Sequence, residues 1–167
     1  MFKAIASLTA ITLFAAPTLS QENGLMISAA DPQGIVSVME MAGYEAELDQ
    51  DGSDDPMIIT ELNGWQARVL FYGCDAESHD GCGSLQLLGG FDRAKPWTAE
   101  EAIQISAQYR YSSVWLDEEG DPFIQWDIVT GDGIPAKVYL RSLREFAQAL
   151  SNAAAMVFEE ENSEEGE

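Results

Sequence analysis

Asn63-Gly64 is the feature of this chain that most restricts its fold. The pair stands between two runs rich in apolar residues, 57–62 and 65–72, and Asn-Gly is typical of a two-residue hairpin turn. Within 65–72 the side chains at alternate positions, from Trp65 to Phe71, fall on one apolar face. Partial alternation of this kind is typical of an antiparallel sheet with one buried face.

Helices are predicted on both sides of this hairpin. Asp31-Pro32 is typical of a helix start, and Thr98 with Glu101 has the spacing of a capping box. The patterns predict helices over 32–42, 98–109 and 135–158, and further strands over 44–48, 84–88, 111–116 and 123–129. The order is helix, three or four strands, helix, two strands, helix, which predicts an α+β domain with an antiparallel sheet flanked by helices.

The first twenty residues have the three parts of a secretory signal peptide. Lys3 precedes an apolar run over 4–16, and small residues at 18 and 20 predict cleavage after Ser20. A buried N-terminal helix is the alternative. We expect a lead-in over 21–30, one domain over 31–158 and a disordered acidic tail over 159–167. The predicted location is periplasmic or secreted, without membrane insertion after cleavage.

The charge limits the classes of partner, and the cysteine content agrees with export. A formal net charge of −21 repels phosphate backbones and anionic headgroups, which argues against nucleic-acid and membrane-surface partners. Cys74 and Cys82 bracket a short loop and are predicted to form a disulfide in an oxidising compartment. The alternative is a metal site formed by both cysteines and His79, which would need reduced thiolates and a fourth ligand.

Three further groups of residues are candidates for function. Asp49, Asp51, Ser53 and Asp55 have EF-hand spacing, but Asp54 replaces the glycine and Thr60 the glutamate, so a solvated turn is favoured over a calcium site. The tryptophans, which are Trp65, Trp97, Trp115 and Trp126, are expected mostly in the core, and the alternative is that they line a ligand-binding surface. Trp115 and Trp126 are expected on one sheet face.

Lys137, Arg141 and Arg144 form the third group, because their spacing places them on one face of the last helix. They are predicted either to pair with carboxylates of the same chain or to dock an acidic partner or a second copy. No nucleophile, base and metal set typical of an enzyme is found. We therefore predict no catalytic residue, no metal and no cofactor.

Several short motifs occur in a family-like order. They are Asp31-Pro32, Gly43-Tyr44, Asp55-Pro56, Phe71-Tyr72-Gly73-Cys74, Cys82 with Ser84-Leu85-Gln86, Arg110-Tyr111, Leu116-Asp117 and Gly120-Asp121-Pro122. On these residues the chain resembles, over about 31–150, the YbjN-domain family of bacterial sensory-transduction regulators. Ile105 and Ser106 stand where that family has a Trp-Asn pair. The resemblance implies a fold similar to type III secretion chaperones, and protein binding more than catalysis.

These observations predict an exported, non-enzymatic module that binds another protein in a regulatory or chaperone-like role. A homodimer is compatible with this prediction. A periplasmic sensor of a small ligand or calcium is the first alternative. A hydrolase of unrecognised type is the second, and it has the least support.

Overall fold

The structure is a computed structural model that describes residues 24–159 and Ser163. The predicted signal peptide, 1–20, and most of the acidic tail, 159–167, lie outside these residues. The helices are α1 (Pro32–Met41), α2 (Ala99–Gln108) and α3 (Ala136–Val157). The strands are β1 (Met26–Ile27), β2 (Ala46–Gln50), β3 (Pro56–Leu62), β4 (Trp65–Tyr72), β5 (Ser84–Gly90), β6 (Ser113–Leu116), β7 (Pro122–Val129) and β8 (Ile134–Pro135).

The predicted hairpin is formed by β3 and β4. Leu62 pairs with Trp65 across the turn, and Asn63 and Gly64 both have positive φ, 53° and 85°. Positive φ at both central residues is what a type I′ turn requires. Alternate side chains are buried along both strands, so the hairpin has one face against the core.

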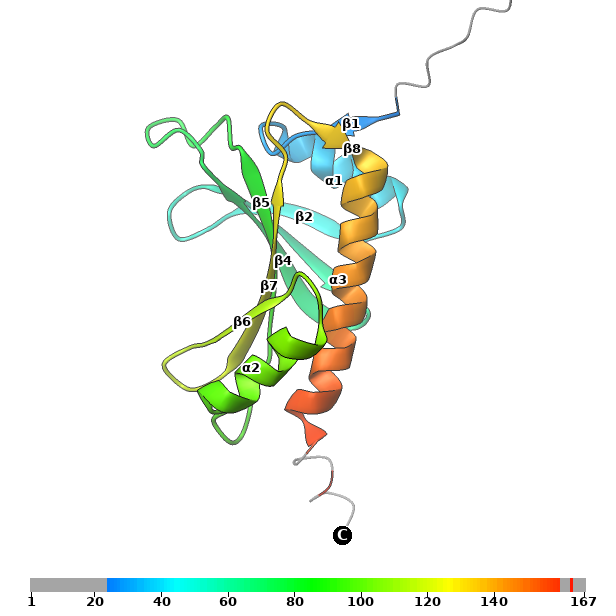
Figure 1. Cartoon of the computed structure of the whole chain (residues 1–167). Coiled ribbons are helices and arrows are strands. Elements are labelled where there is room, and N and C mark those ends of the chain that lie inside the picture. The colour runs from blue at the N-terminus through cyan, green and yellow to red at the C-terminus, as the bar shows by residue number, and fades with distance from the viewer. Residues whose placement is uncertain (1–23, 160–162, 164–167) are drawn as a thin grey trace, which may run out of the picture.

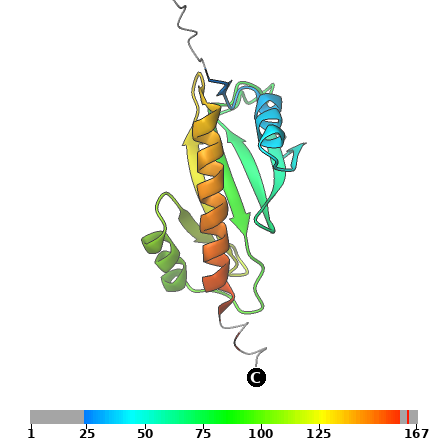
Figure 2. The same ribbon diagram turned by 90° about the vertical axis from the view of Figure 1, so that its right-hand side faces the viewer.

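One antiparallel sheet organises the domain, with the strand order β2-β3-β4-β5-β7-β6. The three helices lie side by side on one face of this sheet (Figures 1 and 2), and the buried apolar side chains gather between them and the sheet. No helix of the described chain covers the opposite face, where Ile59, Tyr72, Trp115 and Val129 are exposed. The predicted α+β class and its order of elements are confirmed.

The last helix packs along the middle of the covered face. Its predicted apolar stripe is buried and comprises Tyr139, Leu143, Phe146, Leu150, Ala153 and Val157. Gly89 of β5 allows the close approach of this helix, because a Cβ atom at Gly89 would lie 2.5 Å from Leu150 Cδ1. The absence of a side chain at one sheet position therefore sets how closely α3 lies on the sheet.

Capping side chains fix the starts of the two shorter helices. Asp31 Oδ1 accepts a hydrogen bond from the Gly34 amide at 3.0 Å, with Pro32 in the first turn of α1. Thr98 and Glu101 form the predicted capping box of α2. Hydrogen bonds donated by the Thr98 backbone and hydroxyl hold the pKa of Glu101 below its ordinary value.

One strand of a short two-stranded ribbon lies within the predicted lead-in, 21–30. Met26 and Ile27 form β1, which pairs antiparallel with β8 at Pro135 and Ile134. Two-residue strands are too short to carry a periodic pattern, so nothing in the sequence indicates them. The pair brings residue 25 next to the start of α3, where the Ala136 amide donates to the Leu25 carbonyl at 2.7 Å. Within the described chain, no helix is both long and apolar enough to cross a membrane.

Candidate binding groove

A groove of about 1300 Å³ runs beside α3. Side chains of α3 between Lys137 and Asn152 line one side, and residues 109–111, which connect α2 to β6, line the other. Trp126, from the helix-covered face of β7, also lines the groove. Figure 2 shows that α2 and α3 lie on the same face of the sheet, so the connection after α2 comes near α3.

The groove gathers positive charge in a strongly acidic protein. Arg110, Lys137, Arg141 and Arg144 line it, and Glu145 is the acidic residue among its lining side chains. These four cations are half of the eight Lys and Arg residues in a chain of net charge −21. We call the surface formed by these four basic residues the cationic groove.

The cations of this groove have no ion-pair partner in the part of the chain that the structure describes. Lys137, Arg141, Arg144 and Arg110 are all exposed. Among the described residues, none of the four takes part in an ion pair within 4.0 Å, and the pair of His79 with Asp55 lies in a different part of the molecule. The alternative that the basic stripe pairs with carboxylates of its own chain is therefore not seen in the described part. Four such cations along one groove attract an acidic ligand.

An exposed aromatic residue stands at the rim of the groove. The ring of Tyr111 stacks on that of Trp126 with centroids 5.0 Å apart, yet Tyr111 remains 74% exposed. Its backbone has φ of 67°, a left-handed conformation that is unusual for a bulky residue. Such strain costs about 1–3 kcal/mol and tends to occur at functional sites. The exposed aromatic surface adds an apolar contact area to the cationic groove.

The structure places the three predicted cations together on one wall and adds residues that the sequence did not indicate. Helical spacing alone predicts that Lys137, Arg141 and Arg144 share one face of α3. Arg110 reaches the same groove from the connection after α2, and neither Tyr111 nor Trp126 carries a local pattern that predicts it there. The signal that could have indicated the side of the groove opposite α3 is Arg110, a basic residue directly after a helix and next to the aromatic Tyr111.

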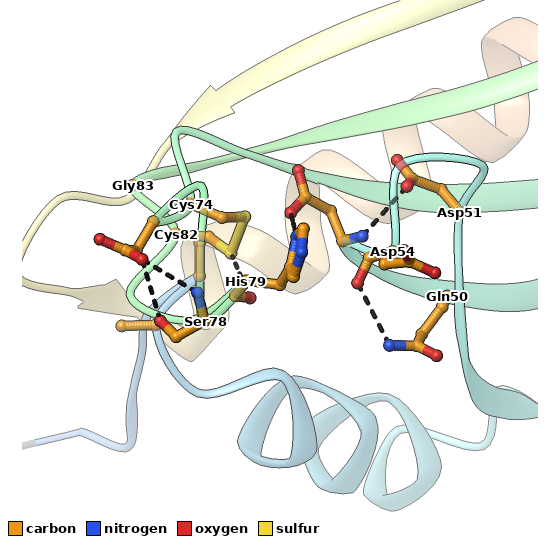
Figure 3. The surroundings of a disulfide bond; sticks show 12 residues. Gln50, Asp51, Asp54, Cys74, Ser78, His79, Cys82 and Gly83 are labelled. Atoms are coloured by element: carbon orange, nitrogen blue, oxygen red, sulfur yellow. Dashed lines mark hydrogen bonds and ion pairs between the residues drawn. A yellow bond between two sulfur atoms is a disulfide. The ribbon is translucent and has the colours of Figure 1, made fainter.

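The predicted disulfide is present between Cys74 and Cys82, whose Cα atoms lie 3.8 Å apart (Figure 3). Inside the loop, Asp75 Oδ1 accepts hydrogen bonds from the Glu77 and Ser78 amides, both at 3.0 Å. The pKa of Asp75 is lowered mainly by the hydrogen bond from the Ser78 amide, and the hydrogen bond from the Glu77 amide is the second cause. The loop is thus ordered by its own hydrogen bonds as well as by the covalent link.

His79 connects this loop to the turn between β2 and β3 through a hydrogen bond. Its Nδ1 lies 2.8 Å from Asp55 Oδ1. The hydrogen bond with Asp55 is the main reason that the pKa of His79 is raised, and the charges of Asp55, Asp54 and Asp51 add to it. The pair is a local contact between two loops, and it lies outside the cationic groove.

The two predicted metal alternatives find no support in the described residues. Both cysteine sulfurs are used in the disulfide, so they cannot serve as thiolate ligands. In the EF-hand-like turn, Asp51 Oδ1 accepts from the Ser53 and Asp55 amides at 2.7 and 3.1 Å. No group of three or more His, Cys, Asp or Glu side chains in the described chain is placed to hold a metal ion.

The four tryptophans have different environments. Trp97 is buried, and Trp65 is half-buried against the core. The expectation that Trp115 and Trp126 share a sheet face is wrong, because Trp115 pairs with Phe123 and side chains three positions apart on β7 point to opposite faces. Trp115 stacks on Phe123 with centroids 4.4 Å apart on the uncovered face, whereas Trp126 lines the groove.

The described residues whose pKa values are shifted do not form a catalytic set. Besides Asp75, His79 and Glu101, the groups with shifted pKa are Tyr72 and Tyr139, and burial is the main cause of the rise in both. Tyr139 donates its hydroxyl hydrogen to Met39 Sδ at 3.1 Å inside the core. These groups are dispersed over loops, a cap and the core, whereas catalysis requires convergence on one reacting atom.

Comparison with known proteins identifies a family. A family model described as "Putative bacterial sensory transduction regulator", named YbjN, matches residues 31–159. No curated protein and no solved structure matches the chain. The similarity to type III secretion chaperones therefore stays a prediction, whereas the family assignment rests on most of the chain.

Proposed function

Because the chain belongs to the YbjN family, we propose that it is an exported regulatory module that binds another protein through the cationic groove and catalyses no reaction. The observation that carries the proposal is the groove itself, in which Arg110, Lys137, Arg141 and Arg144 line one space without carboxylate partners in the described chain. Exposed cations without such partners are suited to binding an acidic ligand.

Export is supported by two independent features. Residues 1–20 have the charge, apolar run and small residues of a signal peptide. The Cys74–Cys82 disulfide is of a kind that persists in oxidising compartments and is rare in the reducing cytosol. Together they favour a periplasmic or secreted protein, so its partner would be found in the same compartment.

A protein is the ligand that best fits the groove. Nucleic acid and anionic membranes are repelled by the net charge of −21, although the groove itself is positive. Exposed Tyr111 and half-buried Trp126 provide apolar contact area next to the cations, and aromatic and arginine residues are enriched where proteins bind one another. A surface of another protein that carries both acidic and apolar side chains complements both parts of the groove.

Mild crosslinking in the bacterium that makes the protein, followed by affinity purification and mass spectrometry, tests this proposal. We expect a dominant partner that is lost from the double variant Arg141→Glu/Arg144→Glu. Each reversal replaces an attraction by a repulsion, and the salt dependence of binding should weaken with them.

Arg68→Glu is the matched control, because Arg68 is an exposed arginine of β4 that lies outside the groove. It should retain the partner. Recovery of the same partner from the wild type and from the groove variant would contradict the proposal, as would equal loss from the Arg68 control. Circular dichroism of each variant confirms that the fold is unchanged.

A further inference from the structure

A second, apolar cavity adjoins the cationic groove at the start of α3. It has a volume of about 330 Å³, near the lower end of the range of ligand pockets, which is about 300–1,000 Å³. Its lining comes from the chain before β1, the end of α1 and the start of α3, and is apolar apart from Lys137. Leu25 and Met41 stand at its surface, 56% and 70% exposed. We call this cavity the apolar pocket.

The pocket and the groove form one continuous surface. Lys137 and Leu140 line both of them. From Lys137, the remaining cations of α3 follow on successive turns, so that Arg144 lies about 10 Å farther along the helix axis. An apolar contact site and a row of cations are therefore arranged in line along α3.

We infer that the apolar pocket and the cationic groove together bind a segment of a partner protein in which a large apolar side chain is followed by acidic side chains within about 10 Å. The inference rests on the proposed function and specifies the partner. The apolar side chain enters the pocket beside Leu25 and Met41, and the carboxylates lie against Lys137, Arg141 and Arg144. An amphipathic helix or an extended segment supplies this spacing.

The acidic segment 159–167 of the same copy does not fit this site. It contains no large apolar residue, so it has nothing to place in the pocket. The ligand is therefore expected from another chain, and the segment 159–167 serves as a charge-only control peptide.

Selection of random twelve-residue peptides displayed on phage tests the inference even though the partner is unidentified. The folded chain with its disulfide formed is the bait, and peptides that also bind the Arg141→Glu/Arg144→Glu variant are removed. We expect enriched peptides to carry a large apolar residue within four positions of two or more acidic residues. Their affinity should fall about tenfold or more in Arg144→Glu, a change of about 1.4 kcal/mol.

A second variant separates the pocket from the groove. Leu25→Gln/Met41→Gln replaces two exposed apolar side chains by polar ones of similar size, so the fold should persist while peptide affinity falls about fivefold to tenfold. Arg68→Glu should bind as the wild type does, and the peptide of residues 159–167 should bind much more weakly than the enriched peptides.

The outcomes distinguish this inference from the function on which it rests. Enriched peptides that need Arg144 but are indifferent to the Leu25 and Met41 changes would overturn the inference and leave the cationic groove as a binding site. Two outcomes would overturn both the inference and the proposed function. One is enriched peptides without acidic residues, and the other is a selection in which no peptide binds the wild type better than the Arg141→Glu/Arg144→Glu variant. Peptides that behave as expected while no partner is captured in cells would count against the proposed function alone.

Discussion

Removal of the Cys74–Cys82 disulfide should destabilise the domain by about 2.5 kcal/mol. The two cysteines are separated by 8 positions, and the chain-entropy relation gives about 2.6 kcal/mol at 25 °C for a loop of roughly nine residues. In a domain of this size, each kcal/mol lowers the melting temperature by roughly 3–4 °C. The variant Cys74→Ser/Cys82→Ala should therefore melt about 8–10 °C below the wild type, with alanine chosen for the buried position 82.

Differential scanning calorimetry with and without reductant measures this effect. Reductant should lower the melting temperature of the wild type to that of the variant, and it should not change the variant itself. A difference below about 2 °C would refute the reasoning that the link acts by restricting the unfolded chain. It would indicate that the hydrogen bonds of Asp75 and His79 already determine the loop conformation.

Three further predictions concern the packing, pH dependence and capping of the fold. Gly89→Ala should destabilise by about 1–3 kcal/mol in urea unfolding, because its methyl group would clash with Leu150, and an unchanged midpoint would show that α3 does not lie so close. His79 has a raised pKa in the folded protein, so the stabilisation from its pair with Asp55 is present below the ordinary histidine pKa of about 6.5 and is lost as pH rises through the folded value. The melting temperature should accordingly fall between about pH 6 and pH 8 more in the wild type than in Asp55→Asn, and equal slopes would contradict this. Thr98→Ala removes the α2 capping box and should cost about 1 kcal/mol in unfolding free energy, whereas Thr98→Ser should cost much less.

Local patterns in the sequence predicted most of the sheet, because hairpin chemistry and alternation act over few residues. The strand at Trp65–Tyr72 has the predicted bounds, and the strand predicted from Ser84 continues to Gly90. The strand predicted from Tyr111 begins instead at Ser113, since the positive φ of Tyr111 is incompatible with a regular strand. The pair β1 and β8 was missed because its strands are too short to show a period.

The candidate site was predictable only in part. Helical spacing placed Lys137, Arg141 and Arg144 on one face, and the structure places all three in one groove. Arg110 and Trp126 join them through tertiary packing, which no local pattern encodes. The register of β6 against β7 likewise decided that Trp115 and Trp126 lie on opposite faces, and register depends on pairing between strands.

Site-specific photocrosslinking at two exposed valines tests the central claim most directly. Val138, 46% exposed, lines the cationic groove, and Val129, 79% exposed, lies on the uncovered sheet face. With a photoreactive residue at either position in living bacteria, the account predicts a defined protein adduct from position 138 that is lost with Arg141→Glu/Arg144→Glu, and little from position 129. An adduct from position 129 with none from position 138 would contradict the account and place the binding surface on the uncovered sheet face.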